Sequence, residues 1–251
     1  MINKSDLLAV LEPFPVMREC FSKYIDWVCA NVKDRHDEYP LIKAISGNDV
    51  KKLGDIEKLL KQSRDILEIS TADFCRAFGF WDDLLVQDPK KIHDILAEPL
   101  FIIDLRTYGF SSIQKLRHKA GRNPLADFTA YRGGLKFAIE LKTVRTESAW
   151  GNQMRSAWWQ KMWRNNAITK IEDKNRRVLK QLEHTRRSHN CDRTMLVIYS
   201  RRLGPGTLMD AGEYQVELKN LNACYPEIDF FCCKDYYASA VEFYPQLPPV
   251  I

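Results

Sequence analysis

The sequence lacks the features that mark several classes of protein. No apolar run approaches the length needed to cross a bilayer, so we expect no membrane-spanning segment. The first residues, MINKSDLLAVLEPFPVM, have an acidic residue inside a short apolar stretch and no small-residue cleavage site, unlike a signal peptide. There is no glycine-rich phosphate loop, because LGPG at 203–206 is interpreted as a turn between strands. We therefore expect no membrane partner and no nucleotide cofactor.

Cysteine occurs seven times, but never with the spacing of a metal cluster. No two cysteines form a CxxC pair, and Cys232 and Cys233 are adjacent. An odd and scattered set is typical of reduced thiols in a cytoplasmic protein. The sequence therefore predicts neither a zinc cluster nor a disulfide framework, and it favours a cytoplasmic location.

The composition itself is that of an ordinary globular protein with one basic segment. The 251 residues are 45% hydrophobic and 28% charged, enough for one large domain or a core domain with an extension. Residues 143–202 contain 14 Lys or Arg and 5 Asp or Glu, a local charge of +9 in a chain whose net charge is +5. A basic block of this size suits a polyanion such as nucleic acid, and a solvated helix surface is the plain alternative.

The spacing of the apolar residues changes along the chain. Residues 1–105 have helical spacing, so we expect a mainly α-helical N-terminal region that serves target choice or a partner interface. Pro99 is expected to end or kink the last of these helices. Residues 106–251 are expected to hold a helix at 111–121, strands at 126–132 and 135–144, a helix at 168–187, a buried strand at 194–200, and strands at 213–219 and 228–234. This order predicts an α/β fold with a mixed β-sheet flanked by helices.

The stretch NPLADFTAYRGGLKFAIELKTV, residues 123–144, contains an unusual arrangement of charges. A two-residue turn at Gly133-Gly134, favoured because both turn positions need positive φ, pairs residues whose numbers add up to 267. Asp127 then lies opposite Glu140, on the strand face that also carries Lys142. Opposed carboxylates are destabilising unless a cation lies between them, and Mg²⁺ prefers one or two carboxylates. The arrangement predicts a metal site, with a solvated strand face as the alternative.

These residues resemble a known motif. Asp127, twelve further residues and then Glu140-Leu141-Lys142 are similar to the PD-(D/E)XK motif of restriction-endonuclease-like nucleases, although Pro124 stands three residues before the aspartate, so that the literal Pro-Asp pair is missing. By motif and element order the resemblance covers roughly residues 88–200. It implies a restriction-endonuclease-like core within residues 106–251. The implied activity is a Mg²⁺-dependent endonuclease of restriction, defence or recombination that hydrolyses DNA to leave a 5′-phosphate and a 3′-hydroxyl.

The resemblance also implies roles for single residues. The metal ligands would be Asp127, Glu140, the carbonyl of Leu141 and, from a preceding helix, Glu98, with Asp104 as the next candidate. Mn²⁺ could replace Mg²⁺, and Lys142 would orient or activate the attacking water. Gln181, on the flank of the apolar stripe of its helix, would orient water or substrate. Glu98, Asp104 and Gln181 can each equally be an ordinary surface residue.

Nucleic-acid contacts are expected from the basic segment. The candidate residues are Arg145, Arg155, Lys161, Arg164, Lys170, Lys174 and Arg177. For each of the four tryptophans among these cations, core packing or a dimer contact is favoured over base stacking. A second Glu-Leu-Lys, residues 217–219, is interpreted as a solvated strand face.

Several alternatives for the partners and the activity stay open. DNA is the expected partner, and a homodimer or a larger nuclease assembly is a possible organisation. The same fold could belong to a catalytically inactive nucleic-acid-binding subunit. It could also belong to a nuclease specific for RNA or for branched or single-stranded DNA.

Overall fold

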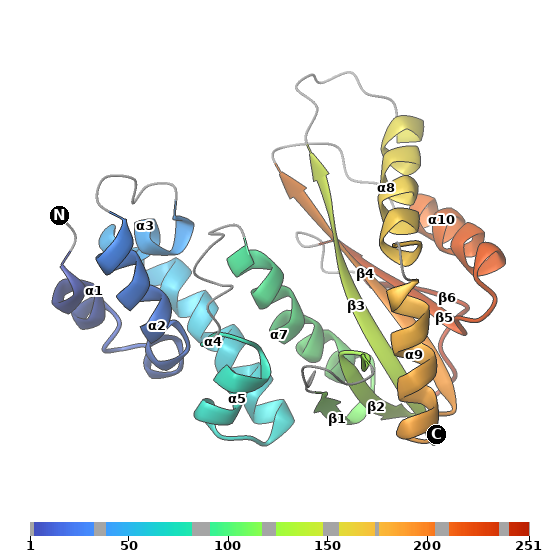
Figure 1. The fold of residues 1–251 in the computed structure, drawn as a ribbon, viewed down its shortest axis with the longest axis horizontal. Helices are drawn as coiled ribbons and strands as arrows, with labels where there is room; N and C mark the ends of the chain where they lie inside the picture. Colours follow the sequence, from blue (N-terminus) through green and yellow to red (C-terminus); the bar gives the residue numbers. More distant parts are fainter. Residues whose placement is uncertain are drawn as a thin grey trace. The chain divides into compact units, whose positions relative to one another are not determined.

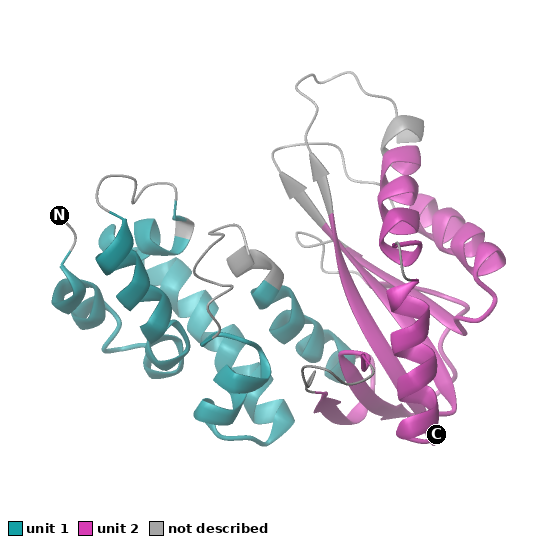
Figure 2. Cartoon of the chain, in the orientation of Figure 1, with its two compact units in different colours: residues 1–107 teal, residues 108–251 magenta. Residues whose placement is uncertain are grey.

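A computed structural model of the chain shows two compact units, residues 1–107 and residues 108–251 (Figure 2). The structure describes residues 3–32, 39–81, 91–116, 124–147, 156–173, 176–203, 211–235 and 241–250. Among these residues, no helix is both long and apolar enough to cross a membrane.

The first unit is built of helices, as expected for the N-terminal region. They are α1 (Lys4–Val10), α2 (Pro15–Asn31), α3 (Pro40–Ser46), α4 (Val50–Leu67), α5 (Thr71–Ala77) and α7 (Lys91–Thr107). Helix α4 packs against α2 and α7. The side chain of Glu57 on α4 accepts hydrogen bonds from the backbone N–H groups of Val16 (3.2 Å) and Met17 (2.7 Å), so α4 caps the first turn of α2.

Pro99 lies inside α7, and the expectation that it ends this helix is wrong. The helix continues to Thr107, with Phe101 and Ile102 buried after the proline. The hydroxyl of Ser63 on α4 donates a 2.7 Å hydrogen bond to the Pro99 carbonyl in the buried contact between the two helices. Packing against α4 thus holds the helix together where proline removes one backbone donor.

The second unit is built around a six-stranded mixed sheet, which confirms the expected fold class (Figure 1). The strands are β1 (Ser111–Lys115), β2 (Phe128–Arg132), β3 (Leu135–Glu147), β4 (Arg193–Leu203), β5 (Phe230–Asp235) and β6 (Val241–Tyr244), in that spatial order. Strands β3, β4 and β5 run parallel to one another, and the other neighbouring pairs are antiparallel. The expected buried strand at 194–200 is confirmed, because all of these residues are buried in β4.

The hairpin of β2 and β3 has the predicted register. Phe128 pairs with Ile139, and Arg132 pairs with Leu135. The turn residues Gly133 and Gly134 have φ angles of 56° and 74°, in the left-handed region that favours glycine. A β-carbon at Gly133 would lie only 2.7 Å from the carbonyl oxygen of Pro249, so the close approach of the C-terminal segment also requires glycine there.

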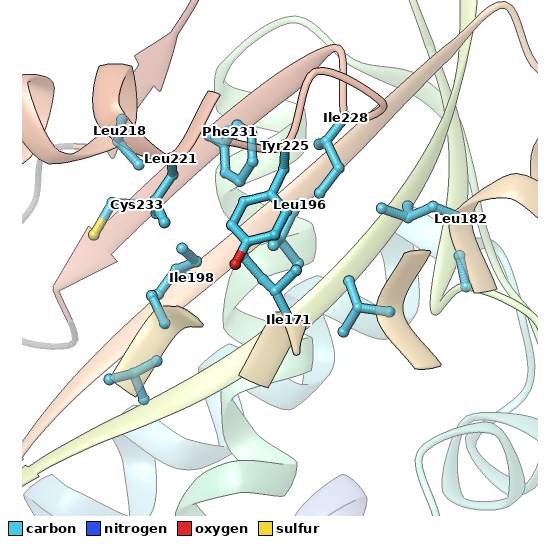
Figure 3. Packing of buried hydrophobic residues seen from close by; sticks show 14 of the residues in the cluster. Ile171, Leu182, Leu196, Ile198, Leu218, Leu221, Tyr225, Ile228, Phe231 and Cys233 are labelled. Atoms are coloured by element: carbon cyan, nitrogen blue, oxygen red, sulfur yellow. The ribbon is translucent and has the colours of Figure 1, made fainter. Parts of the chain in front are cut away.

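Three helices, α8 (Ser156–Ile171), α9 (Arg177–Ser188) and α10 (Ala211–Cys224), cover one face of this sheet (Figure 1). Figure 3 shows part of the resulting core, where Ile171, Leu182 and Leu218 from the helices meet Leu196 and Phe231 from the strands. Complete burial of one such side chain contributes roughly 1.5–3 kcal/mol, so this cluster fixes the helices on the sheet.

Three of the expected elements differ in the structure. Residues 111–115 form the strand β1 because they pair with β2, and residues 213–219 lie in helix α10. Tyr214, Leu218 and Leu221 are the buried apolar residues of α10, a helical stripe that a seven-residue window cannot distinguish from alternation. The single helix expected at 168–187 is divided between α8 and α9 by Arg176, whose φ is 48°.

Candidate active site

Asp127 and Glu140 are buried where β2 joins the sheet. The exposed fractions are 7% for Asp127 and 0% for Glu140. Ala138 and Val144 belong to the core under the helices, and alternation along β3 places Glu140 and Lys142 on this same face. Both faces of β3 are therefore covered at Glu140, and the alternative of a solvated strand face is wrong for this residue.

The Asp127 carboxylate is held by β1 and β3. Its Oδ2 accepts a 2.8 Å hydrogen bond from the backbone N–H of Leu141, and its Oδ1 lies 3.3 Å from Nζ of Lys115. The backbone carbonyl of Asp127 accepts a 2.8 Å bond from the N–H of Leu116. These contacts fix the carboxylate next to the strand that carries Glu140.

The Glu140 carboxylate is only partly satisfied. Its Oε1 forms an ion pair with Nζ of Lys142, whose side chain is 26% exposed. Its Oε2 is buried and has no hydrogen-bond partner among the described residues. Burial and the nearby Asp127 charge raise the pKa of Glu140 to about 8, against the opposing charges of Lys142 and Lys115. A buried carboxyl oxygen without a partner calls for an explanation, and a bound cation is one.

The two carboxylates suit a hard divalent cation. In the described part of the chain, no group of three or more His, Cys, Asp or Glu side chains is placed to hold a metal ion. Zinc sites use three or four such ligands, whereas Mg²⁺ often takes one or two carboxylates and fills its other positions with water and substrate oxygens. The donor set of Asp127 and Glu140 therefore fits Mg²⁺ or Mn²⁺ and does not fit a closed zinc site.

Helix α9 is bound to the segment that leads into Asp127. The amide Nε2 of Gln181 donates a 2.9 Å hydrogen bond to the carbonyl of Leu125, and Oγ1 of Thr185 accepts a 2.6 Å bond from the N–H of Ala126. Gln181 is buried, so it is not an ordinary surface glutamine, and its Oε1 has no partner among the described residues. Because Nε2 must face the Leu125 carbonyl, the orientation of this amide is fixed.

Thr185→Val should test how firmly α9 holds this segment. Valine keeps the shape of threonine but leaves the buried N–H of Ala126 without an acceptor. We expect the free energy of unfolding in urea to fall by about 1–3 kcal/mol. Ser188→Ala, which removes an exposed hydroxyl from the end of the same helix, should change it by less than about 0.5 kcal/mol. Equal effects of the two substitutions would contradict the anchoring role of Thr185.

Sequence reasoning missed Lys115. Its side chain is 7% exposed, contacts Asp127, and lies with Nζ 4.6 Å from the ring centre of Phe128. The segment 111–121 was expected to be a helix, so no register connected this lysine with the hairpin. Only the pairing of Lys115 with Phe128 across β1 and β2 brings it to the carboxylates.

The two acidic candidates from the preceding helix lie in the first unit. Glu98 and Asp104 are both on α7, Glu98 half-buried and Asp104 buried. The site formed by Asp127, Glu140 and the two lysines consists of residues of the second unit alone, so Glu98 and Asp104 are not part of it. The role of Glu98 as a metal ligand stays a prediction.

The predicted nucleic-acid-binding residues fall into four groups. Lys161, Lys170 and Arg177 are exposed on α8 and α9, and Arg164 pairs with the buried Glu217 on α10 at 2.9 Å. Of Arg145 on β3 only the backbone is described, and Arg155 and Lys174 lie outside the described residues.

Two sequence features in this region have structural roles. The second Glu-Leu-Lys lies on a helix with Glu217 buried, so its interpretation as a solvated strand face is wrong. Trp163 is buried and packs edge-to-face on Tyr214 with ring centres 5.6 Å apart, which confirms core packing for this tryptophan.

Comparison of the chain with protein-family models, with curated proteins and with solved structures gives no match. The fold by itself shows an α/β protein with a mixed six-stranded sheet and flanking helices. Any function therefore has to be argued from the residues of the site.

Proposed function

We propose that the protein is a metal-dependent nuclease that hydrolyses phosphodiester bonds of DNA. The observation that carries the proposal is the buried pair Asp127 and Glu140, with Oε2 of Glu140 lacking a hydrogen-bond partner among the described residues. A buried carboxyl group with a raised pKa next to a second carboxylate is costly for the fold, and such groups concentrate at functional sites.

The surrounding fold supports this proposal. A helix, three antiparallel strands, two helices and a parallel strand follow one another from α7 to β4. The resemblance to PD-(D/E)XK nucleases rests on the order helix, hairpin, helix and buried strand. The observed order keeps this sequence of elements, with the strand β1 in place of the expected helix at 111–121 and with two helices, α8 and α9, in place of one. Asp127 lies directly before β2, and Glu140, Leu141 and Lys142 lie on the neighbouring strand β3, the arrangement that this motif would require.

Each residue of the site would have a separate role in hydrolysis. Asp127 and Glu140, with the Leu141 carbonyl, would hold Mg²⁺, which supplies Lewis-acid activation of water and offsets charge on the phosphate. Lys142, the member of the site that reaches solvent, would donate hydrogen bonds to the attacking water or to a phosphate oxygen. Oε1 of Gln181 can accept a hydrogen bond from that water.

The balance of the reaction is that of in-line hydrolysis. The water oxygen forms a bond to phosphorus, the bond from phosphorus to the 3′-oxygen breaks, and a proton from the water ends on that oxygen. The products are a 5′-phosphate and a 3′-hydroxyl. Exposed cations such as Lys161, Lys170 and Arg177 would hold the nucleic-acid backbone.

A cleavage assay on supercoiled plasmid tests the proposal. The full chain should nick or linearise the DNA with Mg²⁺ or Mn²⁺, and EDTA should stop the reaction. Parallel assays on RNA, on single-stranded DNA and on branched DNA separate the alternative substrates. Retention of DNA in EDTA without cleavage of any of these substrates in metal would replace the proposal with a nucleic-acid-binding role.

A further inference from the structure

We infer that Lys115 is a built-in counterion of Asp127 that competes with the divalent cation for the site. This inference rests on the proposed metal site, and it adds a residue from β1 that acts on metal affinity. Lys115 is a positioning residue here, because it acts through Asp127.

The geometry places the ammonium group where a cation is needed. Nζ of Lys115 lies 3.3 Å from Oδ1 of Asp127, and the two side chains are 7% and 10% exposed. The face of the Phe128 ring, with its centre 4.6 Å from Nζ, provides a second favourable contact for the charge. Because the ion pair is buried, solvent screens it less than a surface pair. Replacing Lys115 by a divalent cation as the partner of Asp127 therefore has a substantial effect on the free energy of cation binding.

The other oxygen of Asp127 has a fixed partner. Oδ2 accepts the hydrogen bond from the backbone N–H of Leu141, a group that cannot leave without breaking the strand geometry. Oδ1 is therefore the atom at which the ammonium group and a divalent cation meet. Two positive charges on one carboxylate oxygen repel each other, so binding of the cation must weaken or displace the contact with Lys115.

Lys136 provides a matched control. It lies on β3, which β2 separates from the strand of Lys115, and its ammonium group also contacts an aromatic ring, that of Tyr131, at 5.6 Å from the ring centre. Its Nζ donates a hydrogen bond to the carbonyl of His189 rather than to either carboxylate. Lys136→Met therefore removes the same charge and a similar ring contact from a place outside the carboxylate pair.

The test is calorimetric titration of the full chain with MnCl₂. Lys115→Met should bind Mn²⁺ about tenfold more tightly than the parent, because the ion no longer replaces a charged hydrogen bond. Lys115→Arg, which keeps the charge, and Lys136→Met should both stay close to the parent. Without metal, Lys115→Met should melt at a lower temperature than Lys136→Met, and Mn²⁺ should raise its melting temperature by a larger amount than that of the parent.

Equal or weaker Mn²⁺ binding by Lys115→Met would overturn the inference. If this variant does not fold, Lys115→Gln, which removes the charge but keeps a donor, takes its place with the same expectation. A parent that binds no detectable Mn²⁺ while the variant does would support competition, and absence of binding in both would overturn it. Tighter binding by the variant, without cleavage of plasmid, RNA, single-stranded or branched DNA by the parent, would refute the nuclease and leave the role of Lys115 intact.

Discussion

Asp127→Asn and Lys142→Ala are each expected to lower the rate of metal-dependent plasmid cleavage by about a hundredfold or more. Asparagine keeps the acceptor for the Leu141 N–H but loses the negative charge that would hold the cation. Alanine at position 142 removes the ammonium group that pairs with Glu140 and reaches solvent. The measurement is the initial rate of conversion of supercoiled to nicked DNA at saturating Mg²⁺.

The second Glu-Leu-Lys provides the control for this prediction. Lys219 occupies the same place in that tripeptide as Lys142 in the first, but it lies exposed on α10. Lys219→Ala should therefore cleave at the rate of the parent, and circular dichroism should show that all the variants are folded. Cleavage that survives Asp127→Asn would mean that the hairpin is not the active site.

Glu140→Gln is expected to stabilise the metal-free protein at high pH. The pKa of Glu140 rises from its ordinary value of 4.5 to about 8 in the folded chain, first through burial and then through Asp127. Between these two values the folded state binds more protons than the unfolded state, so the stabilisation present below pH 4.5 is lost as the pH rises through about 8. Glutamine does not ionise and escapes this loss, which amounts to roughly a few kcal/mol.

The measurement is the free energy of unfolding of parent and variant from pH 5 to pH 9 in EDTA. The difference in favour of Glu140→Gln should be small near pH 5 and should grow until about pH 8 to 9. Glu183→Gln, at an exposed position on α9, should show no such growth. Parallel pH profiles of parent and Glu140→Gln would show that the carboxyl group is not perturbed.

Adding Mg²⁺ should stabilise the parent more than Glu140→Gln. A divalent cation favours the ionised carboxylates, so Mg²⁺ should raise the melting temperature of the parent above pH 8 and raise that of Glu140→Gln much less. An equal gain in both proteins would place the bound metal elsewhere.

The sequence by itself determined the local geometry of the hairpin. Two adjacent glycines specify a turn, the turn specifies the register from Arg132–Leu135 to Phe128–Ile139, and the next residues along the two segments are Asp127 and Glu140. The continuous apolar run at 194–200 likewise identified β4 as a strand covered on both faces. These features follow from neighbouring residues alone, which is why they could be predicted.

Other features depended on which segments come together in three dimensions. Residues 111–115 form a strand because they pair with the edge of β2, and this pairing places Lys115 next to Asp127. Residues 213–219 became part of a helix because their buried positions continue at helical spacing to Leu221 and Tyr225.

The same distinction separates the two copies of Glu-Leu-Lys. In β3 the tripeptide leaves Glu140 buried beside Asp127, and Glu140 forms an ion pair with Lys142 two residues further along the same strand. In α10 the same tripeptide places Glu217 where it forms an ion pair with Arg164 on the adjacent helix α8. Periodicity tells which residues share a face, but the electrostatic environment of a carboxylate depends on what packs over that face, and only the tertiary structure decides that.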